Sequence, residues 1–342
     1  MRIGLLLPHS GPAGLWRVGG QACARLAAEE GAGGEPVDLI QMDCGETPET
    51  AAAAATALRD DHGVDVVVGM QPSHQRNAIT RALSGEVGYI YTPQYEGGWC
   101  GPGALPLGVT DAEAMAPSIA WLARRQAVSR WFFVGNDYLW PRAAHGVAAA
   151  TVRAAGGVMA GAAMIPFGQC DYDILFSRIK RSRADAVAVV LLGEEGVRFH
   201  RAFAAAGLAR RAARFCLGCD ETLLWALTGA EAEGLYACQP YFAGADDPSR
   251  DAMLDSYEGL FAGASPPVTS LTLGVYDGVR LARALCAGAR GARRRSIAKR
   301  LQSGFDRRAA LAKLNLPATH NGSPRLHIGE ADGAAFRSEC LA

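Results

Sequence analysis

The segment VDVVVGMQPSHQRNAITRALS, residues 64–84, decides the fold class. It joins a Val-rich run without polar alternation, typical of a parallel strand buried on both faces, to a helix-like stretch. The same order recurs along the chain. Strand-like runs lie at residues 3–7, 37–42, 64–69, 88–91, 131–134, 157–165, 186–192 and 234–241, and helix-like stretches at 19–30, 49–61, 74–84, 112–126, 141–155, 172–181 and 196–206. This order predicts an α/β fold with parallel sheets and right-handed crossovers.

Two helix starts carry clear capping signals. Thr47 supplies a capping hydroxyl, Pro48 suits the first turn, and Glu49 complements the helix dipole. Either Thr110 or Asp111 can cap the helix that follows it. These signals place helix boundaries near residues 48 and 111.

The order of segments predicts two lobes. The polar stretch GADDPSR, residues 244–250, reads as a crossing point, and three helix-like stretches follow at 251–262, 271–287 and 296–303. The tail reads as a hairpin with a turn at 320–322 and a strand at 325–329. We expect an N-terminal lobe of residues 1–112 and 246–310, and a C-terminal lobe of residues 113–245 and 311–342. Such a chain leaves a ligand cleft between the lobes, at the carboxyl ends of parallel strands.

Composition excludes several classes of protein. The 342 residues include 34 Lys plus Arg and 34 Asp plus Glu, a formal net charge of +0 that argues against a nucleic-acid-binding surface. The basic run RGARRRSIAKR, residues 290–300, reads as a solvated helix face. No apolar run is long enough to span a membrane. The nine scattered cysteines and the absence of a recognisable signal peptide favour a cytoplasmic protein, with a periplasmic location as the alternative if an export signal is missing.

Enzyme motifs are absent from the sequence. It contains no phosphate-binding loop, no G-x-S-x-G elbow and no histidine spacing typical of a metal site. Cys216 and Cys219 form a lone C-x-x-C, which we interpret as two buried thiols at the end of a strand. The sequence therefore predicts a binding protein without cofactor or metal, and not an enzyme.

Two aromatic loops follow strand ends. Tyr91 and Pro93 lie in the segment YTPQYEG, residues 91–97, and Tyr138 and Trp140 lie in GNDYLWPR, residues 135–142. Tyr and Trp offer a flat apolar wall together with a hydrogen-bonding group, which suits a small amide. Each single ring could equally be core packing, but two such loops at equivalent strand ends favour binding.

Two polar residues occupy similar positions. Ser73 follows the strand at 64–69, and it could cap the next helix, contact a ligand, or do both. Glu221 could accept an amide N–H or favour the following helix through its dipole. The sequence leaves these alternatives open.

The aromatic loops resemble the signature segments of amide- and urea-binding proteins in the type I periplasmic-binding-protein superfamily. Three further segments agree in order: VVVGMQPSHQRNA at 66–78, ADAVAVVLLGEEGVRFHRA at 184–202 and GLYACQPYFAGADDPSR at 234–250. The resemblance covers residues 2 to about 290. It is strongest to the aliphatic amidase expression regulator and to the urea or short-chain amide receptors of ABC transporters.

The resemblance implies a function for the expected lobes. Ser73, Tyr91 and Tyr138 match pocket positions of the family, Pro93 and Trp140 accompany them, and Glu221 falls in the opposite lobe. The lobes would close over a small amide or urea-like ligand, and a partner would read the closed form. We expect a cytoplasmic sensor that regulates amidase expression through an RNA-binding antitermination protein. The alternative is a transporter receptor for amides, urea or amino acids, with a membrane permease as its partner.

Overall fold

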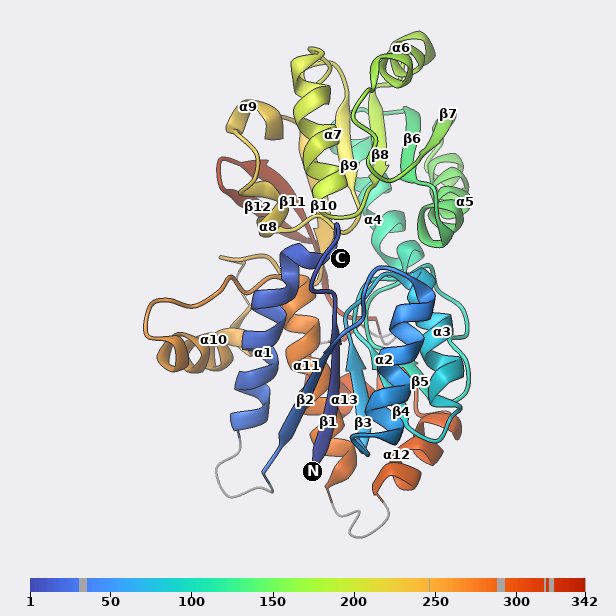
Figure 1. Ribbon diagram of the computed structural model, residues 1–342. Helices are drawn as coiled ribbons and strands as arrows, with labels where there is room; N and C mark the ends of the chain where they lie inside the picture. Colours follow the sequence, from blue (N-terminus) through green and yellow to red (C-terminus); the bar gives the residue numbers. More distant parts are fainter. Residues whose placement is uncertain (31–35, 246, 288–292, 317, 320–322, 342) are drawn as a thin grey trace. The chain divides into compact units, whose positions relative to one another are not determined.

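The chain folds into two α/β units (Figure 1). The computed structural model describes residues 1–30, 36–245, 247–287, 293–316, 318–319 and 323–341. The first unit comprises Met1–Val109 and Asp246–Pro324, and the second comprises Thr110–Ala245 and Arg325–Ala342. Each unit is therefore formed by two separate segments of the chain. The chain passes from the second unit back to the first within residues 244–250, where the sequence predicts a crossing point.

The first unit contains a five-stranded sheet in the order β2-β1-β3-β4-β5. All its neighbouring strands are parallel, as the sequence predicts, and residues 66–69 and 88–91 are buried throughout. Its strands are β1 (Arg2–Leu7), β2 (Asp38–Asp43), β3 (Val66–Gly69), β4 (Gly88–Tyr91) and β5 (Ala104–Pro106). The short β5 was not predicted, because three residues ending in a proline give no periodic signal.

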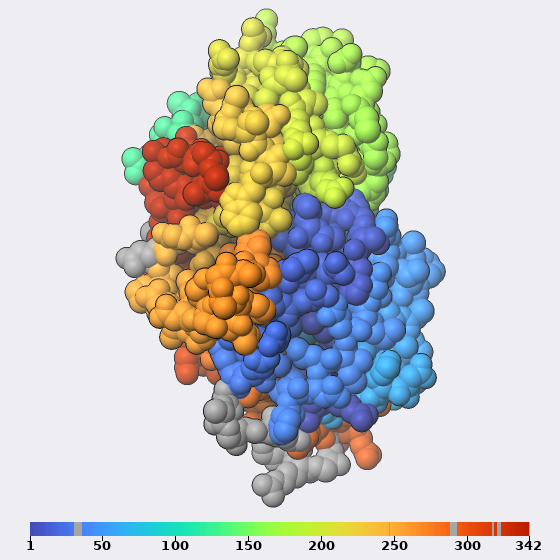
Figure 2. Space-filling view, turned by 60° about the vertical axis from the view of Figure 1, so that its left-hand side comes forward, coloured from blue at the N-terminus to red at the C-terminus, as the bar shows by residue number. Residues whose placement is uncertain are grey.

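Helices cover both faces of this sheet. They are α1 (Arg17–Glu29) with the short η1 (Gly14–Trp16) before it, α2 (Pro48–Asp60), α3 (Ser73–Leu83), α10 (Pro248–Phe261), α11 (Ser270–Cys286), α12 (Arg293–Gln302) and α13 (Arg307–Lys313). Helices α2 and α3 pack together, and α1 packs on α11 and α10. The space-filling view shows the orange surface of α10 and α11 beside the blue surface of α1 (Figure 2).

The second unit contains a seven-stranded sheet in the order β12-β11-β10-β9-β8-β6-β7. Its strands are β6 (Arg130–Asn136), β7 (Val158–Ile165), β8 (Ala186–Val190), β9 (Ala213–Cys216), β10 (Leu235–Gln239), β11 (Leu326–Asp332) and β12 (Ala335–Leu341). The first five are parallel to one another, and β11 and β12 join antiparallel. Its helices are α4 (Asp111–Arg125), α5 (Leu139–Ala154), α6 (Asp173–Ser182), α7 (Glu194–Ala205), α8 (Glu221–Leu224) and α9 (Gly229–Ala232).

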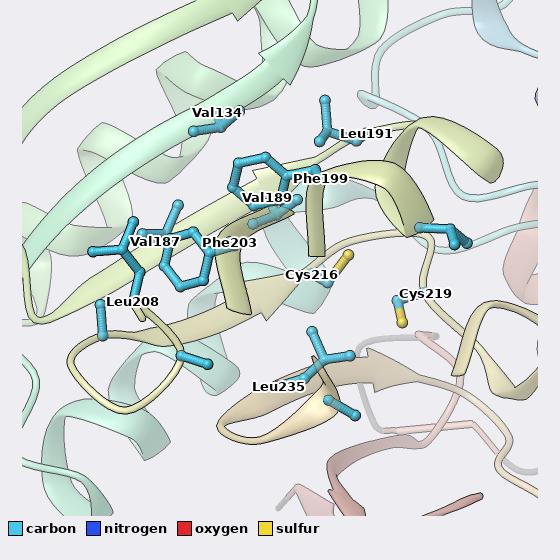
Figure 3. Packing of buried hydrophobic residues seen from close by; sticks show 14 of the residues in the cluster. Val134, Val187, Val189, Leu191, Phe199, Phe203, Leu208, Cys216, Cys219 and Leu235 are labelled. Carbon is cyan, nitrogen blue, oxygen red and sulfur yellow. The ribbon is translucent and has the colours of Figure 1, made fainter. Parts of the chain in front are cut away.

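An aromatic and aliphatic core holds α7 against the second sheet (Figure 3). Phe199 and Phe203 are four residues apart and therefore lie on one face of α7, with ring centroids 5.5 Å apart. Both pack among Val187 and Val189 of β8. Each buried phenylalanine contributes about 1.5–3 kcal/mol through removal of its surface from water.

Two capping predictions are confirmed. The hydroxyl of Thr47 accepts a hydrogen bond from the N–H of Thr50 at 3.2 Å, with Pro48 at the first turn of α2. The side chain of Thr110, not that of Asp111, caps α4, since its hydroxyl accepts from the N–H of Glu113 at 3.3 Å. Asp111 is the first residue of the helix.

The tail differs from its prediction. The strand expected at 325–329 is present as β11, but it forms its hairpin with β12, which follows it, through a turn containing Gly333 at φ 67°. The turn expected at 320–322 lies outside the described residues. The lobe boundary expected at 310 would divide α13, which packs on α11, so the first unit continues to Pro324.

Candidate functional site

Hydrogen bonds join the loops at the carboxyl ends of the second sheet. The buried side-chain carbonyl of Asn136, the last residue of β6, accepts from the N–H of Leu192 after β8 at 2.9 Å. The amide of Gln239, the last residue of β10, donates to the carbonyl of Cys219 after β9 at 3.0 Å. Asn136 therefore fixes the loop after β8, and Gln239 fixes the loop after β9.

Glu221 lies buried in this edge, with only 1% of its surface exposed. Its Oε1 accepts a hydrogen bond from the N–H of Ala243 at 2.7 Å. Its Oε2 is buried without a hydrogen-bond partner among the described residues. Burial raises the pKa of this carboxyl to about 7, and the neighbouring charge of Asp220 acts in the same direction. The alternative interpretation, that Glu221 favours the following helix, also agrees with the structure, because Glu221 is the first residue of α8. The capping side chain of this helix is that of Asp220.

Aromatic side chains gather beside the loop that follows β6. The half-buried ring of Tyr138 lies 6.4 Å from the ring of Trp140 and 5.5 Å from that of Phe167, measured between centroids. The indole N–H of Trp140 donates to the buried carboxylate of Asp111 at 2.9 Å. A side chain at Gly218, which has φ 69° after β9, would approach the Trp140 ring to 3.1 Å. Trp140 is thus fixed from two sides.

Sequence reasoning missed Phe167 and Asp111. Phe167 follows β7 as Tyr138 follows β6, and 43% of its surface is exposed, so its position after the predicted strand at 157–165 was the available signal. Asp111 was considered only as a helix cap. No sequence signal connects it to Trp140, because the hydrogen bond joins residues 29 positions apart.

Ser73 occupies the start of α3 in the first unit. Its side chain is 3% exposed, and its hydroxyl oxygen has no hydrogen-bond partner among the described residues. The structure places Pro72 at the N-cap position, with no side-chain capping hydrogen bond. The capping interpretation of Ser73 is therefore wrong, because the serine already lies within the first turn.

Tyr91 belongs to the core of the first unit. It is 1% exposed and meets the rings of Tyr89 and Tyr95 edge to face, at centroid distances of 6.2 and 6.4 Å. The guanidinium of Arg76 lies 5.1 Å from its ring centre and forms a salt bridge with Glu96. This environment gives the ring the packing role that the sequence left open beside ligand binding.

Pro93 is half-buried in the loop after β4. A Cβ atom at Gly108 would lie only 2.1 Å from the Pro93 carbonyl oxygen, so the glycine permits a close backbone approach. The preceding Thr92 donates from both its N–H and its hydroxyl to the carbonyl of Gly69, at 3.0 and 3.2 Å. Pro93 thus lies in a loop that is fixed to the end of β3.

Cys216 and Cys219 are buried thiols, as the sequence predicts. Both are 0% exposed and lie in the hydrophobic cluster of the second unit (Figure 3). The hydrogen bond with the Cys216 side chain, together with burial, holds the pKa of the Cys219 thiol well above its usual range. Within the described ranges, no group of three His, Cys, Asp or Glu side chains could hold a metal ion. No described helix is both long and apolar enough to cross a membrane.

Comparison with known proteins identifies the family. Residues 1–333 match the family described as periplasmic binding protein. The chain belongs to this family. The resemblance to the type I superfamily is therefore confirmed, while no comparison distinguishes an amide- or urea-binding branch.

Solved structures of solute- and substrate-binding proteins share the two-lobed α/β fold. A solute-binding protein of an ABC transporter from Rhodopseudomonas palustris, in complex with benzoate, has 17% identity and a TM-score of 0.81, with 99% of this chain and 95% of that chain covered. A periplasmic binding protein from Burkholderia mallei has 19% identity and a TM-score of 0.82, covering 100% and 94%. A branched-chain amino acid transporter substrate-binding protein from Streptococcus pneumoniae, in complex with isoleucine, has 16% identity and a TM-score of 0.79, covering 100% and 99%.

Proposed function

We propose that the chain is the solute-binding receptor of an ABC transporter and that Glu221 contacts its ligand. The observation that carries the proposal is the buried Oε2 of Glu221, which has no partner among the described residues. Leaving a buried polar atom unpaired costs about 1–3 kcal/mol, and a ligand hydrogen bond would remove that cost. Two of the solved relatives named above, those from Rhodopseudomonas palustris and Streptococcus pneumoniae, are described as binding proteins of transporters and support this choice.

The receptor reading is the alternative that the sequence offered. None of the relatives named above supports the cytoplasmic sensor or its antitermination partner. A membrane permease is the partner that fits a transporter receptor, and the family description fits a periplasmic location. We therefore place the receptor function before the amidase regulator.

The ligand that fits these groups carries N–H donors and a planar or apolar body. Glu221 can accept an N–H at Oε2, and the rings of Tyr138 and Phe167 offer an apolar wall. Amides, urea and the ammonium groups of amino acids meet this requirement. A second carboxylate would be repelled by an ionised Glu221, so aromatic acids are less favoured. Ser73 of the first unit remains a ligand residue predicted from the sequence alone, and its buried hydroxyl can both donate and accept.

Signalling would follow from differential affinity. A ligand shifts an open–closed equilibrium only by the difference between its affinities for the two states. The cleft between lobes and its closure over a ligand remain predictions from the sequence. Ligand contacts made in only one conformation would supply the difference that a permease reads.

Thermal unfolding against a ligand panel tests the proposal. The panel contains acetamide, butyramide, urea, leucine, isoleucine and benzoate. A ligand that binds only the folded protein adds about 2.7 kcal/mol of stability at a hundredfold excess over Kd. We expect a rise in the midpoint with an N–H-bearing ligand, and a loss of that rise in Glu221→Gln.

The matched control is Glu231→Gln, because Glu231 lies in the same unit and takes part in the capping box of α9. It should retain the full response to the ligand. A response that survives in Glu221→Gln, or one limited to benzoate, would overturn the ligand assignment. No response to any member of the panel would overturn the assigned ligand class as a whole.

A further inference from the structure

The first unit carries a basic groove between α12, α13 and the loops before and after β4. Two pockets of about 540 Å³ and about 420 Å³ adjoin there, and Gln302 lines both. We propose that this basic groove binds an acidic segment of a partner polypeptide, with Trp99 packing against an apolar side chain of that segment. All of its described walls lie within the first unit, at Gly85–Glu86, residues 95–106 and residues 294–308.

Positive charge dominates the lining of the basic groove. It is lined by the cations Arg294, Arg295, Lys299, Arg307 and Arg308 and by the acids Glu86 and Asp306. The exposed side chains of Arg295, Lys299 and Arg308 form no salt bridge with a carboxylate of the described residues. Three cations thus point to a polyanionic partner, although the chain as a whole has a net charge of +0.

The two acids leave this excess largely uncompensated. Glu86 lies 3.8 Å from the guanidinium of Arg294, and both side chains are partly or largely exposed. Asp306 accepts a hydrogen bond from the N–H of Ala309 at 2.9 Å and so caps α13. Exposed pairs of this kind contribute at most about 1 kcal/mol, so an incoming carboxylate can compete for Arg294.

An exposed aromatic side chain lines the basic groove. Trp99 is 82% exposed, the largest fraction among the exposed large hydrophobic residues described. It lines the larger pocket together with Phe305 and Leu105. Tryptophan and arginine are the residue types most often found to dominate binding energy at protein interfaces. The groove therefore offers an apolar anchor beside its cations.

The walls are held in place by the core. A Cβ atom at Gly88 in β4 would lie 2.8 Å from Ile297 and 3.0 Å from Leu301, so α12 approaches the strand closely. The amide of Gln302 donates to the carbonyl of Gly85 at 2.7 Å. Figure 1 shows α12 beside β4 and β5, in agreement with their contacts. A preformed groove loses less conformational entropy on binding.

A polypeptide segment fits better than a small anion or a lipid surface. Each pocket is already large enough for one small molecule, and their junction at Gln302 extends the site along the helix. A flat anionic membrane would meet only projecting cations, whereas here Arg294 and Arg307 are partly buried in the walls. Arg307 also donates to the carbonyl of Gly108 at 2.9 Å, which fixes one wall.

Fluorescence anisotropy with a labelled acidic peptide, DEDEFDEDE, tests the proposal on the full chain. We expect saturable binding that weakens when salt rises from about 50 to about 200 mM, because screening reduces the attraction between exposed charges. The triple variant Arg295→Glu, Lys299→Glu and Arg308→Glu should raise Kd by about tenfold or more. Trp99→Ala should raise it by about fivefold or more.

The control variant reverses three exposed cations of the second unit, Arg125→Glu, Arg153→Glu and Arg181→Glu, and so changes the net charge equally. It should bind the peptide as the unchanged chain does, and the basic peptide KRKRFKRKR should not bind. An equal loss in the control variant, or no peptide binding at all, overturns the proposal. Groove-dependent binding to phosphatidylglycerol vesicles without peptide binding assigns the groove to lipid instead. The ligand panel above should respond identically in both triple variants, which separates this test from that of the receptor function.

Discussion

Replacing Glu221 by glutamine is expected to stabilise the second unit at alkaline pH and to leave its stability nearly unchanged at acidic pH. The substitution keeps the shape of the side chain and an oxygen that can accept from the N–H of Ala243. It removes the charge that burial makes unfavourable. The expected gain therefore appears only where Glu221 of the unchanged chain is ionised.

The magnitude follows from the pKa. In the folded chain the carboxyl has a pKa of about 7, against an ordinary value of 4.5. One pKa unit corresponds to about 1.4 kcal/mol, so ionisation in the folded state costs about 3 kcal/mol. Because the pKa is raised in the folded state, the contribution of this carboxyl to the free energy of unfolding is fully present below pH 4.5. That contribution is lost as the pH rises through 7. The variant should therefore gain up to about 3 kcal/mol between about pH 5 and about pH 8.5.

Thermal unfolding without ligand at several pH values measures this difference, because a urea titration would add a member of the proposed ligand class. Tryptophan fluorescence reports mainly on the second unit, because Trp121, Trp131, Trp140 and Trp225 lie there, against Trp16 and Trp99 in the first. A gain that is independent of pH, or a variant that is less stable at about pH 8.5, would refute the reasoning.

Glu231→Gln is the matched control. The N–H of Thr228 donates to this carboxylate and holds its pKa below the ordinary value. A lowered pKa contributes stability above the unfolded pKa, which is lost as pH falls through the folded value. Any effect of this substitution should therefore be a small loss at neutral pH that disappears in acid, the opposite of the Glu221→Gln pattern.

Four further substitutions probe other parts of the fold. Burial beside Arg214 holds the pKa of His200 well below its ordinary 6.5, so stability should fall as pH drops below 6.5 in the unchanged chain but less in His200→Gln, as thermal midpoints without ligand will show. Tyr91→Ala should cost about 3–5 kcal/mol of folding stability, whereas Tyr138→Ala should keep the fold and weaken ligand binding, which chemical denaturation and thermal shift separate. Gly135→Ala should cost about 1–3 kcal/mol in the same denaturation assay, because its Cβ would lie 2.5 Å from Pro141.

The contrast between Tyr91 and Tyr138 shows which part of the candidate site could be predicted from the sequence. Tyr91 ends the strand predicted at 88–91, and Tyr138 follows the strand predicted at 131–134. Both were assigned to a ligand site from the loops they belong to and from the family resemblance. Tyr91 is the last residue of β4, where alternation places it on the same side as Tyr89, in the core. Tyr138 lies beyond the end of β6 at Asn136 and is only half-buried. The end of β4 was predicted correctly, but a strand pattern does not show whether the last side chain points into the core or toward the open edge of the sheet.

The repeated βα units were predictable because buried parallel strands and capped helices leave strong local signals. The edge of the second sheet was not, since β12 carries Arg337, Ser338 and Glu339 and shows no continuous apolar run. The role of Glu221 was left open for a different reason. Its residue type and place after β9 were visible, but the unpartnered Oε2 depends on which backbone N–H groups reach it.

The pKa of Glu221 also links the identity of the ligand to proton exchange. An N–H donor at Oε2 stabilises the ionised carboxylate and lowers its pKa, so binding at about pH 6, where most of the free protein is protonated, should release up to about one proton. A carboxylate ligand favours the protonated group instead, and its binding at about pH 8 should take up a proton.

Titration calorimetry in two buffers of different ionisation enthalpy measures this exchange directly. The Glu221→Gln variant should exchange no proton through this group, whichever ligand binds. Proton release with amides, urea or amino acids would support the proposed ligand class, and uptake with an aromatic acid would reverse it. A ligand that binds tightly with the same proton exchange in both proteins would show that Glu221 does not contact it.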